Sequence, residues 1–365
     1  MNQQAALFGE AESVQEVHAP FEQVLLGLST LKGLGRKGLG VLSDLFGDEL
    51  ANVWVANATT LARALADERI PSAEALAHAI QAEKEAILGA GFERYEDLKQ
   101  REITVLHGAN LPERLRDVPD APAWLFVEGS VAALTQQPSV AVVGTRQSSP
   151  RGEDAADLVA KLLAAYPLTL VSGLAEGIDA AVHAASLEYG VCNVAFLGTG
   201  IDVVFPKETA GIRERIVQQG GAVVSEYLPG ESYGREKFVQ RNRLQAGLAH
   251  LVVPVEAKEK SGTAHTVRFA RELGRPLLGL RWKGNNGIFD TLKAHGDPVV
   301  DVFTAEGWRE LDRRFRSVAE EAGQETYALA QAERRLLSEM KSRSLRLSDL
   351  ERLRATLDEV ERTLT

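Results

Sequence analysis

The sequence has little cysteine and no long apolar run, and each shortage excludes a class of protein. Cys192 is the only cysteine among 365 residues, which rules out an internal disulfide and hence a disulfide-stapled extracellular scaffold. No stretch is long and apolar enough to span a bilayer, and residues 1–20 show no basic start followed by an apolar run. We therefore expect a cytoplasmic protein without a membrane partner.

Metal-ligand clusters and an excess of basic residues are missing as well. No group of cysteine and histidine has zinc-site spacing, and we expect neither a metal nor another cofactor. The 51 acidic residues outnumber the 41 lysines and arginines, which gives a formal net charge of -10. Repulsion of this sign opposes phosphate binding along the whole surface. Any nucleic-acid site must therefore be a local basic patch.

The composition that is present is that of a globular protein, with 45% hydrophobic and 25% charged residues. A chain of this length exceeds what one hydrophobic core usually organises. We expect a flexible tail over 1–20, a helical domain over 21–106, a larger α/β domain over 107–315 and a small helical domain over 316–365. The last of these has a Ser348/Glu351 capping box before apolar residues three and four apart, which suits a helical appendage or a partner-binding helix.

Residues 21–103 place apolar side chains three and four positions apart and are predicted to be helical. Between the first two helices lies KGLGRKGLG, whose glycines permit a tight turn and whose cations are Lys32, Arg36 and Lys37. In helix-hairpin-helix or SAM-like turns, N–H groups at such a helix start bind a phosphate. A secondary contact with DNA or protein is therefore one interpretation, and a glycine-rich connection with solvated cations is the other.

From Ser139 onward, short β-branched runs alternate with amphipathic helical segments. The runs are SVAVVG, LTLVSG, VCNVAFLG, GAVVSE, HLVVPVE, RPLLGLR and DPVVDVF. In the segment RGEDAADLVAKLLAAY after the first run, apolar residues form one stripe, as in a helix that packs on a sheet. This alternation predicts an α/β fold in which helices cover both faces of a mostly parallel sheet.

Small and polar residues follow three of the expected strands. They are Gly144, Thr145 and Arg146 after the first strand, Ser172 and Gly173 after the second, and Gly198, Thr199 and Gly200 after the third. In an open parallel sheet these ends line one crevice, where glycine lets N–H groups approach a phosphate and helix N-termini favour negative charge. The sequence therefore predicts an anion-binding edge of the sheet.

The segment DVVFPKE adds a cation and an aromatic ring near the third strand end. Arg146 offers a fork for phosphate oxygens, Lys207 a mobile point charge and Phe205 a stacking face. Cations and an aromatic ring along a groove are typical of a track for single-stranded nucleic acid. The alternative is that Phe205 belongs to the core and Lys207 to a solvated loop.

Two further helix starts carry candidate ligand contacts. The first has Arg241, Asn242 and Arg243, and the second has Ser261, Gly262 and Thr263. Arg241 and Arg243 are two positions apart and diverge on a regular helix, which leaves one for a ligand and the other for a structural salt bridge. The second start is a weak phosphate-loop signal when taken alone, because many strand-to-helix turns have this composition.

Taken together, six stretches of this chain resemble the core of the DprA/Smf family of DNA-processing proteins. They are VAVVGTRQSSPRG, LVSGLAEGIDAAVHAASLEYG, LGTGIDVVFPKE, GAVVSEYLPG, FVQRNRLQAGLAHLVVPVEA and SGTAHTVRFARELGRP. The resemblance covers about residues 111–303 and implies an extended Rossmann-like domain that binds single-stranded DNA in a basic pocket. Arg146 and Lys207 match the family's phosphate-binding positions, and Ser172, Gly173, Gly198, Thr199, Gly200, Arg241 and Asn242 fall around the same pocket.

The resemblance also implies a function without catalysis. Members of the family protect incoming single-stranded DNA and load RecA onto it during natural transformation. They form homodimers through the Rossmann-like domain, and single-strand-binding protein is a further expected partner.

A nucleotide-binding sensor or a hydrolase of small nucleotides in the same crevice is the alternative function. The fold superfamily includes the cytokinin-activating phosphoribohydrolases, whose PGGxGT-E segment supplies a carboxylate beside the ribose, whereas SGTAHT lacks the glycine pair and the following Glu. Asp179 and His183 form an i,i+4 pair near Ser172, but no nucleophile elbow surrounds that serine. Glu226 and Glu256 end buried strands, and we expect each to accept hydrogen bonds from loop amides or an arginine.

Overall fold

The structure is a computed structural model that describes residues 19–259, 261–285 and 287–321. Two expected features, most of the tail over 1–20 and the capping box at Ser348 and Glu351, lie outside the described residues. The chain forms two compact units, each assembled from separate segments. The first unit contains residues up to 131 with 196–210 and 222–244, and the second contains 132–195, 211–221 and the residues from 245 onward.

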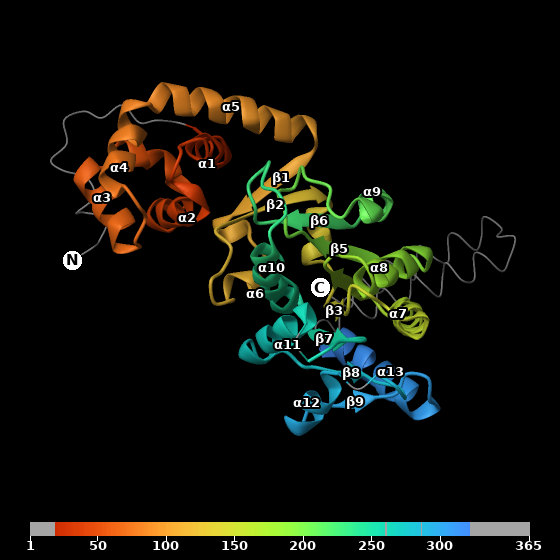
Figure 1. Ribbon diagram of the computed structural model, residues 1–365. Coiled ribbons are helices and arrows are strands. Elements are labelled where there is room, and N and C mark those ends of the chain that lie inside the picture. Colours follow the sequence, from red (N-terminus) through yellow and green to blue (C-terminus); the bar gives the residue numbers. More distant parts are fainter. Residues whose placement is uncertain (1–18, 260, 286, 322–365) are drawn as a thin grey trace, which may run out of the picture. The chain divides into compact units, whose positions relative to one another are not determined.

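The first unit begins with helices, as their apolar spacing predicts. They are α1 (Phe21–Leu28), α2 (Gly35–Phe46), the 3-10 segment η2 (Gly47–Trp54), α3 (Ala58–Asp67), α4 (Ala73–Ala82) and α5 (Lys84–Gln100) (Figure 1). Most of their leucines at the predicted apolar positions are buried. A Cβ at Gly27 would collide with the carbonyl of Ile87, so the missing side chain lets α1 lie directly against α5.

A seven-stranded sheet has the strand order β1-β2-β6-β5-β4-β3-β7. The strands are β1 (Ile103–His107), β2 (Trp124–Gly129), β3 (Ser139–Val143), β4 (Thr169–Ser172), β5 (Cys192–Phe196), β6 (Ala222–Ser225) and β7 (Leu251–Pro254). β3 pairs in parallel with β4 and β7, and β4 in parallel with β5. The predicted α/β class with a mostly parallel sheet is confirmed.

Two strands at one end of the sheet were not expected from the sequence. β1 pairs with β2 and β2 pairs with β6, both antiparallel. The chain between β1 and β2 contains the short elements η3 (Gly108–Asn110) and α6 (Glu113–Arg116), and η4 (Val131–Leu134) follows β2. The sheet therefore begins at Ile103, four residues before the expected start of the α/β domain at 107.

Helices alternate with the parallel strands in the second unit. They include α7 (Pro150–Leu163), α8 (Ile178–Glu188), α11 (Gly262–Glu272), α12 (Phe289–Ala294) and α13 (Ala305–Glu321), and a small parallel pair is formed by β8 (Gly279–Leu280) and β9 (Val299–Val300). Two helices, α9 (Ala210–Gln218) and α10 (Arg235–Leu248), each continue from one unit into the other. The short element η5 (Lys207–Thr209) directly precedes α9.

The core of the second unit is apolar and continuous. The stripe of α7 that includes Ala155, Val159 and Leu163 packs against the β3 and β4 side chains Val140 and Leu170. α7 begins where Ser149 accepts a hydrogen bond from the Gly152 N–H at 3.1 Å, which satisfies one of the open donors of the helix start. Within the described residues, none of the helices is long and apolar enough to cross a membrane.

Candidate functional site

In the second unit, the loop after β3 presents Arg146 to solvent. The Thr145 N–H donates to the Glu256 carbonyl at 2.7 Å, which ties the loop to the end of β7. The Glu256 carboxylate accepts from the Ser149 N–H at 2.9 Å and from the Ser149 hydroxyl at 3.1 Å. The expected architectural role of Glu256 is confirmed, because its side chain holds the loop that carries Arg146.

The glycines of this edge allow close packing. A Cβ at Gly144 would lie 2.5 Å from the Ile178 side chain, and the Ile178 N–H donates to the Thr145 carbonyl at 3.1 Å. Gly177 adopts a φ of +77°, where a side chain would be strained, and a Cβ there would strike the Thr145 carbonyl oxygen. These close contacts hold the start of α8 against the loop that follows β3.

The hydroxyl and glycine after β4 are buried. Ser172 is 0% exposed, and its hydroxyl donates to the Val142 carbonyl on β3 at 2.6 Å. Gly173 is buried beside it. The Ser172 side chain is thus committed to the sheet and is not presented to a ligand.

The start of α11 is partly open. Gly262 is exposed and Ser261 half-buried, with the Ser261 hydroxyl donating to the Lys258 carbonyl at 2.6 Å, whereas Thr263 is buried. The hydroxyl of Ser261 makes no capping hydrogen bond to the helix. A ligand contact here would therefore use the exposed backbone of Gly262 rather than the threonine.

In the first unit, the segment after β5 is also tightly packed. A Cβ at Gly198 would lie 2.7 Å from the Phe238 ring, and one at Gly200 would lie 2.5 Å from the Leu228 carbonyl oxygen. The Gly200 N–H donates to the Glu231 carbonyl at 2.8 Å, and Thr199 is buried. Gly198 and Gly200 allow two segments to meet, and the Gly200 N–H is already engaged.

Beyond this segment, cationic and aromatic side chains reach the surface of the first unit. The Lys207 side chain is exposed and forms no hydrogen bond or ion pair with any residue in the described ranges. Phe205 is 39% exposed and Tyr233 is 46% exposed, with their ring centroids 4.6 Å apart. Both rings contact the buried Phe238, at 6.0 Å and 5.3 Å. We call Phe205, Tyr233 and Phe238 the aromatic cluster.

Tyr233 was not singled out in the sequence. Its loop, PGESYGRE, has turn residues on both sides of the tyrosine, and a large aromatic residue in such a loop is the signal that could have identified it. Arg235, two residues further, is exposed as well. The structure thus identifies Tyr233 as a second exposed ring beside Phe205, and Arg235 as a second exposed cation of the first unit besides Lys207.

The arginines of α10 face different partners. Arg243 donates two hydrogen bonds to the Glu226 carboxylate, at 2.8 Å and 2.7 Å, and its Nε donates to the Asp120 carbonyl at 3.0 Å. Burial alone would lower the pKa of Arg243, but the hydrogen bonds and charge of Glu226 outweigh it and raise that pKa. The expected structural salt bridge and the architectural role of Glu226 are confirmed.

Arg241 and Asn242 are buried on the same helix. The Arg241 guanidinium lies 5.4 Å from the Phe238 ring centroid and donates to the carbonyl of Phe196 at the end of β5. Its Nε donates to the Asn242 side chain at 3.2 Å. The Arg241 side chain therefore contacts the buried ring of the aromatic cluster, Phe238.

Two of the three cations of the glycine turn make ion pairs inside the first unit. Arg36 contacts the Glu226 carboxylate at 2.8 Å and donates to the Gln240 side chain at 3.0 Å. Lys37 lies 3.4 Å from the Glu68 carboxylate, and Lys32 is exposed. Only Lys32 among these three lacks an ion pair with another described residue.

The residues considered for hydrolytic chemistry are internal. His183 is fully buried, and its Nδ1 lies 2.8 Å from the side-chain oxygen of Asn193. Asp179 is buried in the first turn of α8. Across the described residues, no group of histidine, cysteine and carboxylate side chains is arranged to hold a metal ion. With Ser172 buried as well, the three side chains are not presented to a substrate.

Comparison with known sequences identifies relatives of the sheet region. The family described as DNA recombination-mediator protein A matches residues 102–288. The DNA processing protein DprA of Streptococcus pneumoniae is 39% identical over 179 residues, which cover 49% of this chain and 62% of the relative. Protein Smf of Escherichia coli is 39% identical over 172 residues, which cover 46% of this chain and 45% of the relative. The chain thus spans less than two thirds of the length of these curated relatives.

Solved structures show the same fold. The X-ray structure of DNA processing protein A from Streptococcus pneumoniae superposes with a TM-score of 0.59 at 28% identity, covering 76% of this chain and 94% of that one. A structure of the Helicobacter pylori protein, described for its single-stranded DNA binding mode, has a TM-score of 0.53 at 23% identity and covers 60% and 97%. The second likeness supports the fold of this chain.

Proposed function

Because this chain belongs to the DNA recombination-mediator protein A family, we propose that it binds single-stranded DNA without chemically altering it and delivers the strand to a RecA-type recombinase during natural transformation. The family match covers about half of the chain and includes the exposed Arg146, Phe205 and Lys207. A recombination mediator needs to hold a strand reversibly rather than react with it. Buried Ser172 and His183 fit that requirement, since a hydrolase would present its nucleophile and base.

The combination of Lys207 with the exposed rings of Phe205 and Tyr233 is the observation that carries this proposal. The Lys207 side chain is exposed and makes no ion pair with a described residue, and two exposed aromatic rings belong to the same unit of a chain whose net charge is -10. Single-strand binding uses these two ingredients: a cation neutralises the phosphate and a ring stacks on a base. A duplex keeps its bases stacked on one another and offers no partner to the rings.

Arg146 supplies the corresponding contact on the second unit. Its loop is held by the Thr145 and Ser149 bonds to Glu256, so its backbone is fixed before a ligand arrives. A fixed loop lowers the ordering cost of binding. Arg146 would contact phosphate through its guanidinium.

We also propose that the protein acts as a homodimer. A chain with an excess of acidic residues gains from joining two small basic faces, because each additional phosphate contact raises the affinity for a long strand. Single-strand-binding protein and the recombinase would then meet a strand that is held at two places.

Fluorescence anisotropy with labelled oligo-dT and a matched duplex tests the proposal. We expect the full-length protein to bind oligo-dT more tightly than the duplex, with an affinity that falls as salt is raised. Release of nucleotides or shortened strands should not accompany binding. Failure to bind oligo-dT in low-salt buffer would overturn the proposed function.

A further inference from the structure

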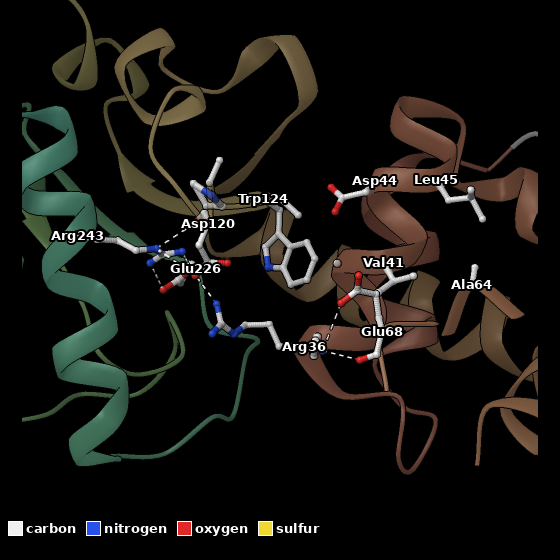
Figure 2. Close-up of a pocket in the computed structure, with 15 residues that line it drawn as sticks. Arg36, Val41, Asp44, Leu45, Ala64, Glu68, Asp120, Trp124, Glu226 and Arg243 are labelled. Atoms are coloured by element: carbon white, nitrogen blue, oxygen red, sulfur yellow. Dashed lines mark hydrogen bonds and ion pairs between the residues drawn. The ribbon is translucent and has the colours of Figure 1, made fainter. Parts of the chain in front are cut away.

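Glu226 and Glu231 are both paired with cations in the first unit, but their surroundings differ. Glu226 is 2% exposed and contacts Arg36 and Arg243, as Figure 2 shows. The Glu231 side chain is 26% exposed and lies in the loop after β6, two residues before the exposed Tyr233. A carboxylate at this position repels a phosphate chain. We therefore expect the Glu231 carboxylate to have a structural role.

The loop that contains Glu231 consists of residues 229–234, which we call the Tyr233 loop. Gly230, Ser232 and Tyr233 are exposed, and Gly230 adopts a φ of +84°. The loop therefore buries little apolar surface of its own. Its conformation depends on polar contacts with the neighbouring segments.

Two of these contacts use the loop backbone. The Gly230 N–H donates to the Asp202 carboxylate at 2.7 Å, and the Glu231 carbonyl accepts from the Gly200 N–H at 2.8 Å. Both partners belong to the segment that follows β5. These bonds anchor the first half of the loop and do not involve the Glu231 side chain.

The Glu231 carboxylate adds two further contacts. One oxygen accepts from the Leu228 N–H at 2.9 Å, and the other lies 2.7 Å from the ammonium group of Lys237, in the first turn of α10. The same ammonium group donates to the Ser232 carbonyl at 3.1 Å. This carbonyl belongs to the peptide bond that leads into Tyr233. Glu231 and Lys237 together therefore hold the backbone directly before the tyrosine.

The Tyr233 ring is both packed and exposed. Its centroid lies 4.6 Å from that of Phe205 and 5.3 Å from that of Phe238, and 46% of the residue is exposed. Because the rings already contact one another, a base has no room between them and would stack on the exposed surface of the aromatic cluster. Such a surface exists only while the loop keeps Tyr233 against Phe205.

We propose that the ion pair of Glu231 and Lys237 positions Tyr233 for stacking on a base of single-stranded DNA. This inference rests on the proposed function. Glu231 is a positioning residue, because it acts through Tyr233 and does not touch the strand. Its charge repels the phosphates, whereas its contacts fix the ring. Removing the charge should therefore weaken the preference for bases even though it removes a repulsion.

Glu231→Gln tests this opposition. Glutamine keeps an oxygen for the Leu228 N–H but loses the charge that holds Lys237. Anisotropy titrations of full-length protein compare oligo-dT with an abasic strand of equal length. We expect the ratio of the two affinities to fall about two- to fivefold, the factor that an ion pair at a partly exposed site contributes. Lys237→Gln should lower the same ratio and keep the salt slope, since its charge is held by Glu231.

Two variants are the controls for these titrations. Glu236→Gln removes an exposed carboxylate from the first turn of α10 that forms no ion pair with a described residue. It should leave the ratio at the wild-type value, and any gain in affinity should be equal for the two strands. Lys237→Arg keeps the ion pair and should retain the ratio.

Fluorine NMR reports on the position of the ring without DNA. Full-length protein made with 3-fluorotyrosine gives a Tyr233 signal, which is the one that disappears in Tyr233→Phe. We expect Glu231→Gln to move this signal toward that of free 3-fluorotyrosine, because the ring loses its contacts with Phe205 and Phe238. Glu236→Gln should leave the signal in place.

The outcomes separate this inference from the proposed function. An unchanged Tyr233 signal in Glu231→Gln, or a wild-type ratio in that variant, would overturn the positioning role while oligo-dT binding stands. A smaller salt slope of Lys237→Gln with an unchanged ratio would assign Lys237 to the phosphates and overturn it as well. Equal affinity of the wild type for the two strands would exclude base stacking. Failure of the wild type to bind oligo-dT would overturn the proposed function itself.

Discussion

The Arg243 guanidinium and the Glu226 carboxylate form a two-bonded ion pair whose side chains are only 5% and 2% exposed. The pair joins α10 to the end of β6, and Arg36 adds a second guanidinium from α2 to the same carboxylate at 2.8 Å. α2, which is distant in the sequence, therefore meets the end of β6 and α10 at Glu226. The pair is part of the fold of the first unit and is not available to a phosphate.

Arg243→Ala should destabilise the protein. It leaves the buried Glu226 carboxylate with one cation instead of two and opens a gap beside Asp120. Breaking a buried ion pair by removing one partner costs about 3–5 kcal/mol, and Arg36 should keep the loss near the lower end. Urea unfolding followed by circular dichroism measures the change.

Arg235→Ala is the matched control for this measurement, because Arg235 is exposed on the same helix. It should change stability by less than about 0.5 kcal/mol. Equal stability of Arg243→Ala and Arg235→Ala would show that the Glu226 pair does not hold α10 in place.

Arg146→Ala and Lys207→Ala should each weaken binding of oligo-dT with the fold intact. Each variant removes one proposed phosphate contact from its own unit, so the slope of log affinity against log salt should decrease by roughly 0.7. Anisotropy titrations at several salt concentrations give the slope. Lys161→Ala, which removes an exposed cation near the other end of α7, should leave it unchanged. Wild-type slopes in both site variants would exclude these residues as DNA contacts.

Tyr233→Ala should weaken binding by removing a stacking surface rather than a charge. Stacking contributes about 1–3 kcal/mol per base, so affinity for oligo-dT should fall at least several-fold while the salt slope is kept. An abasic oligonucleotide provides the second readout, because it retains the phosphates but offers no base. Wild-type protein should prefer oligo-dT to the abasic strand, and the variant should lose much of that preference.

Tyr189→Ala is the control for the stacking experiment. Tyr189 is also exposed, at the end of α8 in the second unit, where its hydroxyl donates to Asp157 at 3.1 Å. Its loss should not alter the preference for bases over abasic sites. If wild-type protein binds the two strands equally, the aromatic cluster has no role in base recognition even where the phosphate contacts are real.

The parallel part of the sheet could be predicted because its strands are short β-branched runs with glycine or polar residues directly after them. β1 and β2 were missed for a physical reason. Most of their side chains are buried, but the chain between them contains three prolines and two short helical turns, and such a composition is typical of a linker. Their pairing with β6 is a long-range contact that local pattern does not encode.

Side-chain roles at the candidate site were predictable only where exposure follows from the local sequence. Arg146 and Lys207 lie in polar turns and are exposed, as expected. Whether Arg241 or Arg243 made the structural salt bridge depended on Glu226, which reaches α10 only in the folded chain. The segment from Gly198 to Gly200 has the composition of a phosphate loop. The missing side chain of Gly198 nevertheless makes room for Phe238, forty residues further along the sequence.

The stability of the first unit should depend on pH through His107. Its ring stacks on Phe21 with centroids 3.9 Å apart, its Nδ1 lies 2.9 Å from the Asp48 carboxylate, and its Nε2 lies 3.7 Å from that of Glu22. Burial alone would lower the pKa of His107, but the two carboxylates outweigh it and hold that pKa above its ordinary value. The same contact, opposed by burial, keeps the pKa of Glu22 below its usual range.

The sign of the effect follows from these two shifts. A raised histidine pKa means that the folded protein binds the proton more tightly, so this stabilisation is full below the unfolded pKa of about 6.5 and is lost as pH rises through the folded value. The lowered Glu22 pKa stabilises the fold above about pH 4.3 and its contribution is lost as pH falls through the folded value. The contact between His107 and Glu22 is therefore strongest between these limits.

His107→Gln should remove this pH dependence. We expect the difference in unfolding free energy between wild type and variant to be larger at pH 5.5 than at pH 8.5, measured by urea unfolding in buffers of equal ionic strength. His78→Gln, at an exposed position on α4, is the control and should differ from wild type by the same small amount at both pH values. A wild-type advantage over His107→Gln that is constant between pH 5.5 and 8.5 would mean that the ring contributes by stacking on Phe21 alone, and that its charge does not hold α1 to β1.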